Sequence, residues 1–423
     1  MFRKLKLLAS FGALQGGVQL TSALSGFILV RVLDKRDFAA YTIATSMQVI
    51  LNLLTDSGIG TGLNALGGRV WQQRDALSRL VSTAFAFRRQ LAWVAVPVGA
   101  VFSLWLLRQN GMPWFKGLAL ALAVVLGLWG MWTTSIYAVP LRLHGRYLAV
   151  QKAELLAALL RLVLIGGLAL AFLNALLAVL VFVISSALQA VLLLHEAGAV
   201  VDRGAPVDVQ QRMELAALVR KQFFSTAFFA FQGQITVWLI SVFGTVEKVA
   251  EVGALGRLAI IFVLVGSVMN GMVSPTFARC DSLSRLKKQF TTTLIAYCVF
   301  AGLILCASFT LPREILWILG EKYSGLTKEL PWLVANGIVA GLTSVFYGLA
   351  SARGWIWHAW VSPLATIALQ GVLLKTLDLS EVKAALMFGF FSLVPTLLSV
   401  CYMVVRGFAA SNRLGCPAHP NVT

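Results

Sequence analysis

The chain has 423 residues, of which 59% are hydrophobic and 12% are charged, and its mean hydropathy is +0.83. A soluble protein of this length would need a far larger polar surface, so the composition excludes a soluble domain and predicts a lipid-covered exterior. The formal net charge is +18, from 35 Lys and Arg against 17 Asp and Glu. Because no nucleic-acid-binding motif accompanies this charge, we attribute it to basic loops beside a membrane and expect no nucleic-acid partner.

Apolar runs of membrane-spanning length recur along the whole chain. They are rich in Leu, Ala and Val and lack the alternation of membrane strands, so they predict helices. We therefore predict an all-α, polytopic integral membrane protein of about twelve transmembrane helices in two six-helix bundles. The predicted spans are residues 8–33, 38–66, 90–107, 116–138, 152–173, 175–195, 221–244, 254–277, 290–311, 331–351, 358–376 and 384–405.

The basic residues set the expected orientation. The first apolar run continues well past the length of a signal peptide, to about Val30, so we interpret it as an uncleaved first span. Most Lys and Arg fall in alternate connections, which is typical of cytoplasmic loops and predicts that both termini are cytoplasmic. The basic connection before the third span, for example, holds Arg69, Arg74, Arg79, Arg88 and Arg89.

Polar residues follow one face of the second span. They are spaced three or four residues apart, so a helix places them in one stripe. Such a stripe indicates either hydrogen bonds between helices or a hydrated cavity. Its members are Tyr41, Thr45, Gln48, Asn52 and Asp56.

Asp56 stands at the end of this stripe, directly before Ser57 and Gly58. One interpretation is a helix end followed by a turn. The other is a proton or cation site, because a desolvated carboxylate titrates closer to neutral pH. Asp56 is therefore the candidate ion-coupling residue.

Three arginines are the candidate substrate-binding residues. Arg161 lies inside an apolar span, with Glu154 two turns away on the same face; packing against a neighbouring helix is the alternative to function there. Arg31 ends the first span and Arg257 opens the eighth, and for both the alternative is snorkelling to the outer interface. In the functional interpretation they line a cavity and bind an anion, because guanidinium grips phosphate bidentately and keeps its charge.

The longest polar connection, about 196–219, contains the turn-forming run Asp202–Pro206 near the chain midpoint. It predicts that the chain is divided in two. The expected parts are an N-terminal six-helix bundle at 1–200, a cytoplasmic linker at 201–219 and a C-terminal six-helix bundle at 220–423.

A short repeat supports this division. The pattern D-x-L-S-R-L occurs at residues 75–80 and again at 281–286, in a basic connection of each half. Its matching positions indicate a duplication. With an even number of spans in each half, the two repeats would run parallel, which is one of the known transporter plans.

Two stretches carry a family resemblance. Residues from Arg31 to Tyr41 read RVLDKRDFAAY, and those from Leu53 to Gly62 read LLTDSGIGTG. They resemble the pattern of Arg-x-Leu, an acidic turn, Phe-Gly-x-Tyr and an Asp-x-Gly-x-Gly helix end found in Wzx-type O-antigen flippases. These are the polysaccharide transporters of the multidrug/oligosaccharidyl-lipid/polysaccharide exporter superfamily. Ala39 stands where that pattern has glycine.

The resemblance implies a V-shaped pair of six-helix bundles around a central cavity in a bacterial inner (plasma) membrane. It implies that an undecaprenyl-pyrophosphate-linked oligosaccharide moves to the periplasmic leaflet by alternating access, for O-antigen, lipopolysaccharide or other polysaccharide biosynthesis. Arg31 falls on the motif, whereas Arg161 and Arg257 come from the residue analysis. Expected partners are the lipid-linked substrate, the bilayer and proteins of glycan assembly. No cofactor, metal or catalytic residue is expected.

Two other functions stay open. An ion-coupled multidrug or small-molecule exporter of the same superfamily would use cavity carboxylates, for which Asp56 and Glu154 are candidates. A membrane enzyme of glycan assembly would need grouped catalytic carboxylates, but Glu314, Glu321 and Glu329 in the longest outer connection are widely spread. No ATP-binding motif is present, so we expect uphill transport to use an ion gradient or a substrate gradient.

Overall fold

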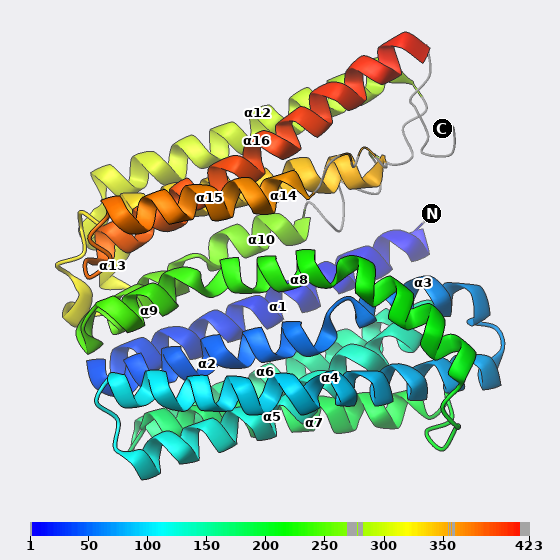
Figure 1. Ribbon diagram of the computed structural model, residues 1–423, viewed down its shortest axis with the longest axis horizontal. Coiled ribbons are helices and arrows are strands. Elements are labelled where there is room, and N and C mark those ends of the chain that lie inside the picture. Colours follow the sequence, from blue (N-terminus) through cyan, green and yellow to red (C-terminus); the bar gives the residue numbers. More distant parts are fainter. Residues whose placement is uncertain are drawn as a thin grey trace. The chain divides into compact units, whose positions relative to one another are not determined.

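The computed structural model describes residues 2–268, 277, 282–353, 355, 357 and 360–414, and regular secondary structure in these residues is helical throughout (Figure 1). The chain forms two compact units, Met1–Ala250 and Glu251–Thr423. The helices of unit 1 are α1 (Phe2–Val32), α2 (Lys35–Asp56), α3 (Ile59–Val70), α4 (Arg74–Gln109), α5 (Trp114–Leu143), α6 (Tyr147–Ala169), α7 (Ala175–Ala197) and α8 (Val209–Phe243).

Helix α9 (Val246–Leu258) crosses the boundary between the units. The helices of unit 2 are α10 (Ile260–Val268), α12 (Leu283–Thr310), α13 (Pro312–Trp317), the 3₁₀ turn η2 (Glu321–Tyr323), α14 (Leu330–Ala352), α15 (Val361–Thr376) and α16 (Val382–Leu414). Within unit 2, α14 packs on α10, α12 and α16, and α15 packs on α16.

Each of the twelve predicted spans overlaps a described helix, which confirms the all-α membrane fold class. Nine described helices are long and apolar enough to cross a membrane, namely α1, α2, α4, α5, α7, α8, α12, α14 and α16. The other three predicted spans correspond to α6, which carries three charged residues, to the shorter α15, and to a segment broken between α9 and α10. Part of that broken segment, and Asp281 of the repeat, lie outside the described residues.

The second predicted span is wrong as a single helix. Its chain breaks between Asp56 and Ile59, where Ser57 has a φ of 42° and Gly58 a φ of 93°. These left-handed conformations end α2, and the backbone N–H of Ser57 closes the last turn on the carbonyl of Leu53 at 2.8 Å. The prediction merged α2 and α3 because apolar residues continue beyond the break.

The third predicted span, 90–107, starts too late. Helix α4 begins at Arg74, because the apolar run before Arg88 continues the same helix. The first occurrence of the repeat, 75–80, is therefore the start of a 36-residue helix. Arg88 lies inside that helix instead of in a loop.

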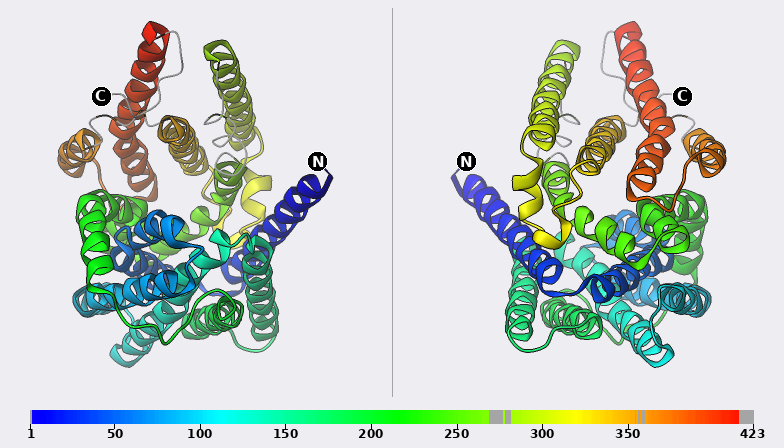
Figure 2. Two further views of the ribbon diagram at one scale, coloured as in Figure 1. Left: turned by 90° about the vertical axis from the view of Figure 1, so that its right-hand side faces the viewer. Right: turned by 90° about the vertical axis from the view of Figure 1, so that its left-hand side faces the viewer.

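The helices of unit 1 form a bundle, which Figure 2 views along their length. Among the described helices, α5 and α7 share the most extensive contact. A Cβ atom built on Gly130 of α5 would lie 2.9 Å from the backbone carbonyl carbon of Ser186 on α7. Because only glycine fits there, the two helices approach backbone to backbone, as small residues allow in membrane helices.

The connection from α7 to α8 is fastened to α4. The buried hydroxyls of Ser78 and Thr83 accept hydrogen bonds from the backbone N–H groups of Asp202 and Asp208, at 2.8 and 2.9 Å. Arg79 lies 3.7 Å from the carboxylate of Asp208. Much of the region predicted as a linker thus follows the surface of unit 1.

Helix α8 packs on α2, α3 and α4 within unit 1. Near its C-terminal end, Asn110 donates to the carbonyl of Ser241 at 2.9 Å, and Trp238 donates to the hydroxyl of Ser46 at 3.4 Å. The predicted bundles 1–200 and 220–423, joined by the linker 201–219, stay a prediction.

Candidate functional site

Two adjoining cavities lie between the helices of unit 1. The first has a volume of about 260 Å³ and is lined by α1, α2, α5, α6 and α7; the second has a volume of about 490 Å³ and is lined by α2 to α7. They share part of their lining, so we treat them together as the unit 1 cavity. The shared lining residues are Asn52, Thr134, Ser135, Glu154 and Gln189.

The unit 1 cavity has a charged lining in an otherwise apolar bundle. Its charged residues in the described part of the chain are two carboxylates and three arginines, namely Asp56, Glu154, Arg88, Arg142 and Arg161. Ionisable groups between membrane helices cost free energy, so they are retained mainly where a cavity or a partner receives them. The cavity is accordingly of mixed charge, with one more cation than anion.

Arg161 reaches this cavity from α6. Its guanidinium donates a hydrogen bond to the hydroxyl of Ser22 on α1 at 2.7 Å and lies 5.8 Å from the ring centre of Phe182 on α7. Glu154, two turns earlier on α6, lines the same cavity and interacts electrostatically with Arg142 and Arg161. Two of the three charged residues of α6, Glu154 and Arg161, therefore line the cavity, which explains how this helix carries them.

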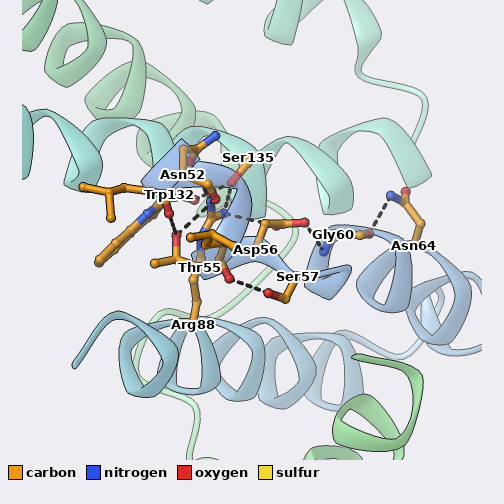
Figure 3. Close-up of polar contacts among 11 residues, drawn as sticks. Asn52, Thr55, Asp56, Ser57, Gly60, Asn64, Arg88, Trp132 and Ser135 are labelled. Carbon is orange, nitrogen blue, oxygen red and sulfur yellow. Dashed lines mark hydrogen bonds and ion pairs between the residues drawn. The ribbon is translucent and has the colours of Figure 1, made fainter. Parts of the chain in front are cut away.

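Arg88 lies at the centre of a network of hydrogen bonds and an ion pair in the site (Figure 3). Its guanidinium donates to the backbone carbonyl of Asn52 at 3.0 Å, to the side-chain Oδ1 of Asn52 at 2.7 Å, and to the hydroxyl of Ser135. It also lies 3.3 Å from Asp56 and 5.8 Å from the ring centre of Trp132. With 1% of its side chain exposed, Arg88 joins α2, α4 and α5.

Asp56 occupies the break between α2 and α3. One of its oxygens lies beside Arg88, and the other accepts from the backbone N–H of Gly60 at 3.4 Å, in the first turn of α3. A carboxylate is stabilised there by the helix N-terminus. Asp56 is thus a helix-end residue and also lines the second cavity, so both interpretations of its position have a structural basis. Its role in ion coupling stays a prediction.

Arg31 and Arg257 are placed differently from Arg161. Arg31 is exposed near the C-terminal end of α1 and does not line the unit 1 cavity. Arg257 is half-buried near the end of α9, in unit 2. Of the three predicted arginines, only Arg161 lines this cavity, and the substrate-binding role of all three stays a prediction.

The motif that carries the resemblance makes the turn between α1 and α2. Asp34 caps α2 by accepting from the backbone N–H of Asp37 at 2.7 Å. Arg36 donates to the carbonyl of Gly111, in the connection between α4 and α5. The first part of the motif therefore fixes the entry of α2, while its last part places Asp56 at the cavity.

Arg88 and Arg142 were missed by the sequence analysis as cavity residues. Arg88 was assigned to a basic cytoplasmic connection, although it follows an apolar run that extends its helix. Asn52 and Asp56 lie one turn apart on a half-buried face, which could have indicated that a cation lies opposite. Nothing in the sequence names Arg88 as that cation.

The fold and the cavity define a polytopic helical membrane protein whose N-terminal unit encloses a charged, hydrogen-bonding cavity. No protein-family model matches the chain, and no curated protein gives a significant match. Solved structures do match. The chain is similar to the eukaryotic MATE transporter AtDTX14, with a TM-score of 0.69, 13% identity, and 98% of each chain covered.

Two further solved structures are also similar to this chain over most of its length. An inward-facing multidrug resistance MATE family transporter of the MOP superfamily gives a TM-score of 0.68 at 12% identity, covering 93% of this chain and 96% of the other. The lipid II flippase MurJ gives a TM-score of 0.61 at 11% identity, covering 96% of this chain and 90% of the other. At these identities the likeness establishes the shared fold.

Proposed function

We propose that the chain is a membrane transporter that moves a lipid-linked oligosaccharide from one leaflet to the other, with a pyrophosphate-linked head group as cargo. The observation that carries this proposal is the position of Arg161. This cation stands on a largely apolar helix, and its side chain lines a polar cavity. Guanidinium suits a phosphate oxygen, and the serine, threonine and amide groups around it suit sugar hydroxyls. The fold is compatible with this cargo, because MurJ is named as a lipid II flippase.

In this proposal the head group occupies the unit 1 cavity while the lipid tail stays in the bilayer. The combined volume suits only part of an oligosaccharide, so sugars enter the cavity in sequence or extend beyond it. Arg31 and Arg257 would then contact the cargo at other stages of an alternating-access cycle. The membrane would be a bacterial inner membrane with both chain termini cytoplasmic.

The test is mass spectrometry of lipids from cells that lack the chain. Accumulated undecaprenyl-pyrophosphate-linked oligosaccharide, removed when the wild-type chain is returned, would support the proposal. Returning Arg161→Ala should leave the lipid accumulated. Lys152→Ala is the matched control, because Lys152 is exposed on the same helix and does not line the cavity. A normal lipid profile in cells without the chain would refute the proposed cargo.

A second candidate is an ion-coupled exporter of cationic small molecules. The observation that favours it is the pair of carboxylates, Asp56 and Glu154, in the same cavity. Here a carboxylate would exchange a proton or cation for the substrate. Its test is uptake of a fluorescent cationic dye into vesicles under an imposed pH gradient. Uptake by the wild-type chain that Glu154→Gln abolishes would favour the exporter over the flippase.

A further inference from the structure

Within the described residues, the hydrogen bonds and the ion pair of Arg88 all go to residues that line the unit 1 cavity. Its hydrogen-bond and ion-pair partners are Asn52, Asp56 and Ser135, and all three line that cavity. They come from α2 and α5, whereas Arg88 comes from α4. A guanidinium presents its donors in a rigid planar fork, so binding three partners at once fixes their relative positions.

The contact also fixes which way the amide of Asn52 faces. Guanidinium has no acceptor, so the atom of Asn52 that meets Arg88 at 2.7 Å must be the carbonyl Oδ1. The Nδ2 amino group is consequently turned away from Arg88. Asn52 lines both parts of the cavity, and its Nδ2 has no hydrogen-bond partner among the described residues.

Thr134 and Ser135 are neighbours on α5, and they differ in whether their hydroxyl can still donate a hydrogen bond to a ligand. The hydroxyl of Ser135 accepts from Arg88 and donates to the carbonyl of Trp132 at 3.0 Å, so its proton is already used. The hydroxyl of Thr134 also lines both parts of the cavity, and its buried oxygen has no partner in the part of the chain that the structure describes. Asn52 Nδ2 and Thr134 Oγ1 therefore remain as donors.

We propose that Arg88 is a positioning residue of the transport site: it turns Asn52 so that the amide N–H groups of Asn52, with the hydroxyl of Thr134, donate to an oxygen-rich head group. In this proposal Arg88 acts through Asn52 and not by contacting the cargo, because its Nη1 and Nη2 atoms are engaged by Asn52, Asp56 and Ser135 and its Nε is buried. This inference rests on the proposed transport function. It assigns Asn52 and Thr134 as determinants that select cargo rich in acceptor oxygens, such as phosphate and sugar groups.

The test compares variants in vesicles loaded with purified lipid-linked oligosaccharide. We expect Arg88→Gln to raise the KM for transport at least tenfold. The kcat per folded molecule should change less. Asn52→Asp should raise KM similarly, because it replaces the free donor by an acceptor while keeping an oxygen for Arg88. The matched control is Arg89→Gln, the next residue on α4, which is exposed and should keep the wild-type KM.

A double-mutant cycle separates positioning from a merely structural role. If Arg88 acts through Asn52, then Asn52→Ala should raise KM much less in the Arg88→Gln background than in the wild-type background. Additive effects on KM would overturn the proposal, as would a wild-type KM in folded Arg88→Gln. Should Arg88→Gln fail to fold, Arg88→Lys replaces it, because it keeps the charge beside Asp56 but loses the fork.

A substrate-independent readout distinguishes this inference from the proposed function. Hydrogen–deuterium exchange of the segment from Asn52 to Gly60 should be faster in Arg88→Gln and unchanged in Arg89→Gln. If the wild-type chain does not move the lipid-linked oligosaccharide while this exchange changes, the proposed cargo fails and Arg88 still positions the α2 end. If exchange is unchanged, Arg88 does not hold Asn52, and the inference fails whatever the cargo is.

Discussion

Arg161 and Ser22 join α6 to α1 through one charged hydrogen bond of 2.7 Å at the lining of the unit 1 cavity. The bond has a consequence for the cavity: it holds a guanidinium beside the space that a head group would enter. The hydroxyl of Ser22 is a neutral acceptor. The positive charge of Arg161 is therefore oriented by Ser22 without being neutralised by it.

From this we predict that Ser22→Ala lowers transport less than Arg161→Ala. Ser22→Ala removes one hydrogen bond to a charged group, worth about 1.5–3 kcal/mol, but leaves the cation in place. Arg161→Ala removes the cation and should reduce transport to background. The measurement is transport rate per folded molecule in reconstituted vesicles. Equal rates for Arg161→Ala and wild type would remove Arg161 from the site.

Asp56 should have a measurable role in stability, apart from any role in ion coupling. Asp56→Asn leaves buried Arg88 without its anion, and we expect a loss of about 1–3 kcal/mol, reduced because Asp56 is partly exposed. Asp56→Asn combined with Arg88→Gln should recover part of that stability, because both charges are then gone. Thermal unfolding in detergent measures this. Recovery of stability without transport would show that the pair is needed for more than folding.

Ion coupling at Asp56 has a separate signature. A coupling carboxylate makes the transport rate depend on an imposed pH gradient. If Asp56 couples protons, Asp56→Asn should transport slowly and without pH dependence. An Asp56→Asn variant that transports slowly but keeps the wild-type pH dependence would leave Asp56 as a helix-end residue that positions α2 and α3.

Helix identity follows from the sequence because lipid imposes it. Any apolar run of spanning length must satisfy its backbone hydrogen bonds internally, so each predicted span overlaps a helix. Helix ends are less determined. The break after Asp56 depends on left-handed conformations at Ser57 and Gly58, which hydropathy does not indicate. The start of α4 was placed too late because Arg88, which is buried inside the helix, was assigned to a loop.

The site was predictable where one helix carries the pattern. Asn52 and Asp56 share a face of α2, and Arg161 lies alone in an apolar segment, so both were identified. The partners of these residues were not. Arg88 meets Asn52, and Ser22 meets Arg161, only because distant helices pack together. Charge beside a predicted span was assigned to a loop, since a basic residue next to a membrane usually lies there.

The hydrogen bonds that fasten the connection before α8 to α4 can be tested by proteolysis. Thr83→Val keeps the shape of the side chain but leaves the backbone N–H of Asp208 without its acceptor, at a cost of about 1–3 kcal/mol. We expect trypsin to cleave after the exposed Arg203 several times faster in this variant. Ser82→Ala, one position earlier on α4, is the control. Equal cleavage rates in Thr83→Val and wild type would mean that this bond does not restrain the connection.

The close approach of α5 and α7 should make Gly130 intolerant of any side chain. Gly130→Ala would place Cβ 2.9 Å from the backbone of Ser186, so the helices must separate, and we expect a loss of about 1–3 kcal/mol. Gly166→Ala on α6 is the matched control, because a Cβ there meets nothing within 4 Å. The control should unfold at the wild-type temperature or slightly above it, since alanine favours helix. Separation of α5 and α7 would also widen the cavity that both helices line, so Gly130→Ala should weaken transport even in its folded fraction. If both variants unfold alike, the packing of α5 against α7 is looser than the backbone contact implies.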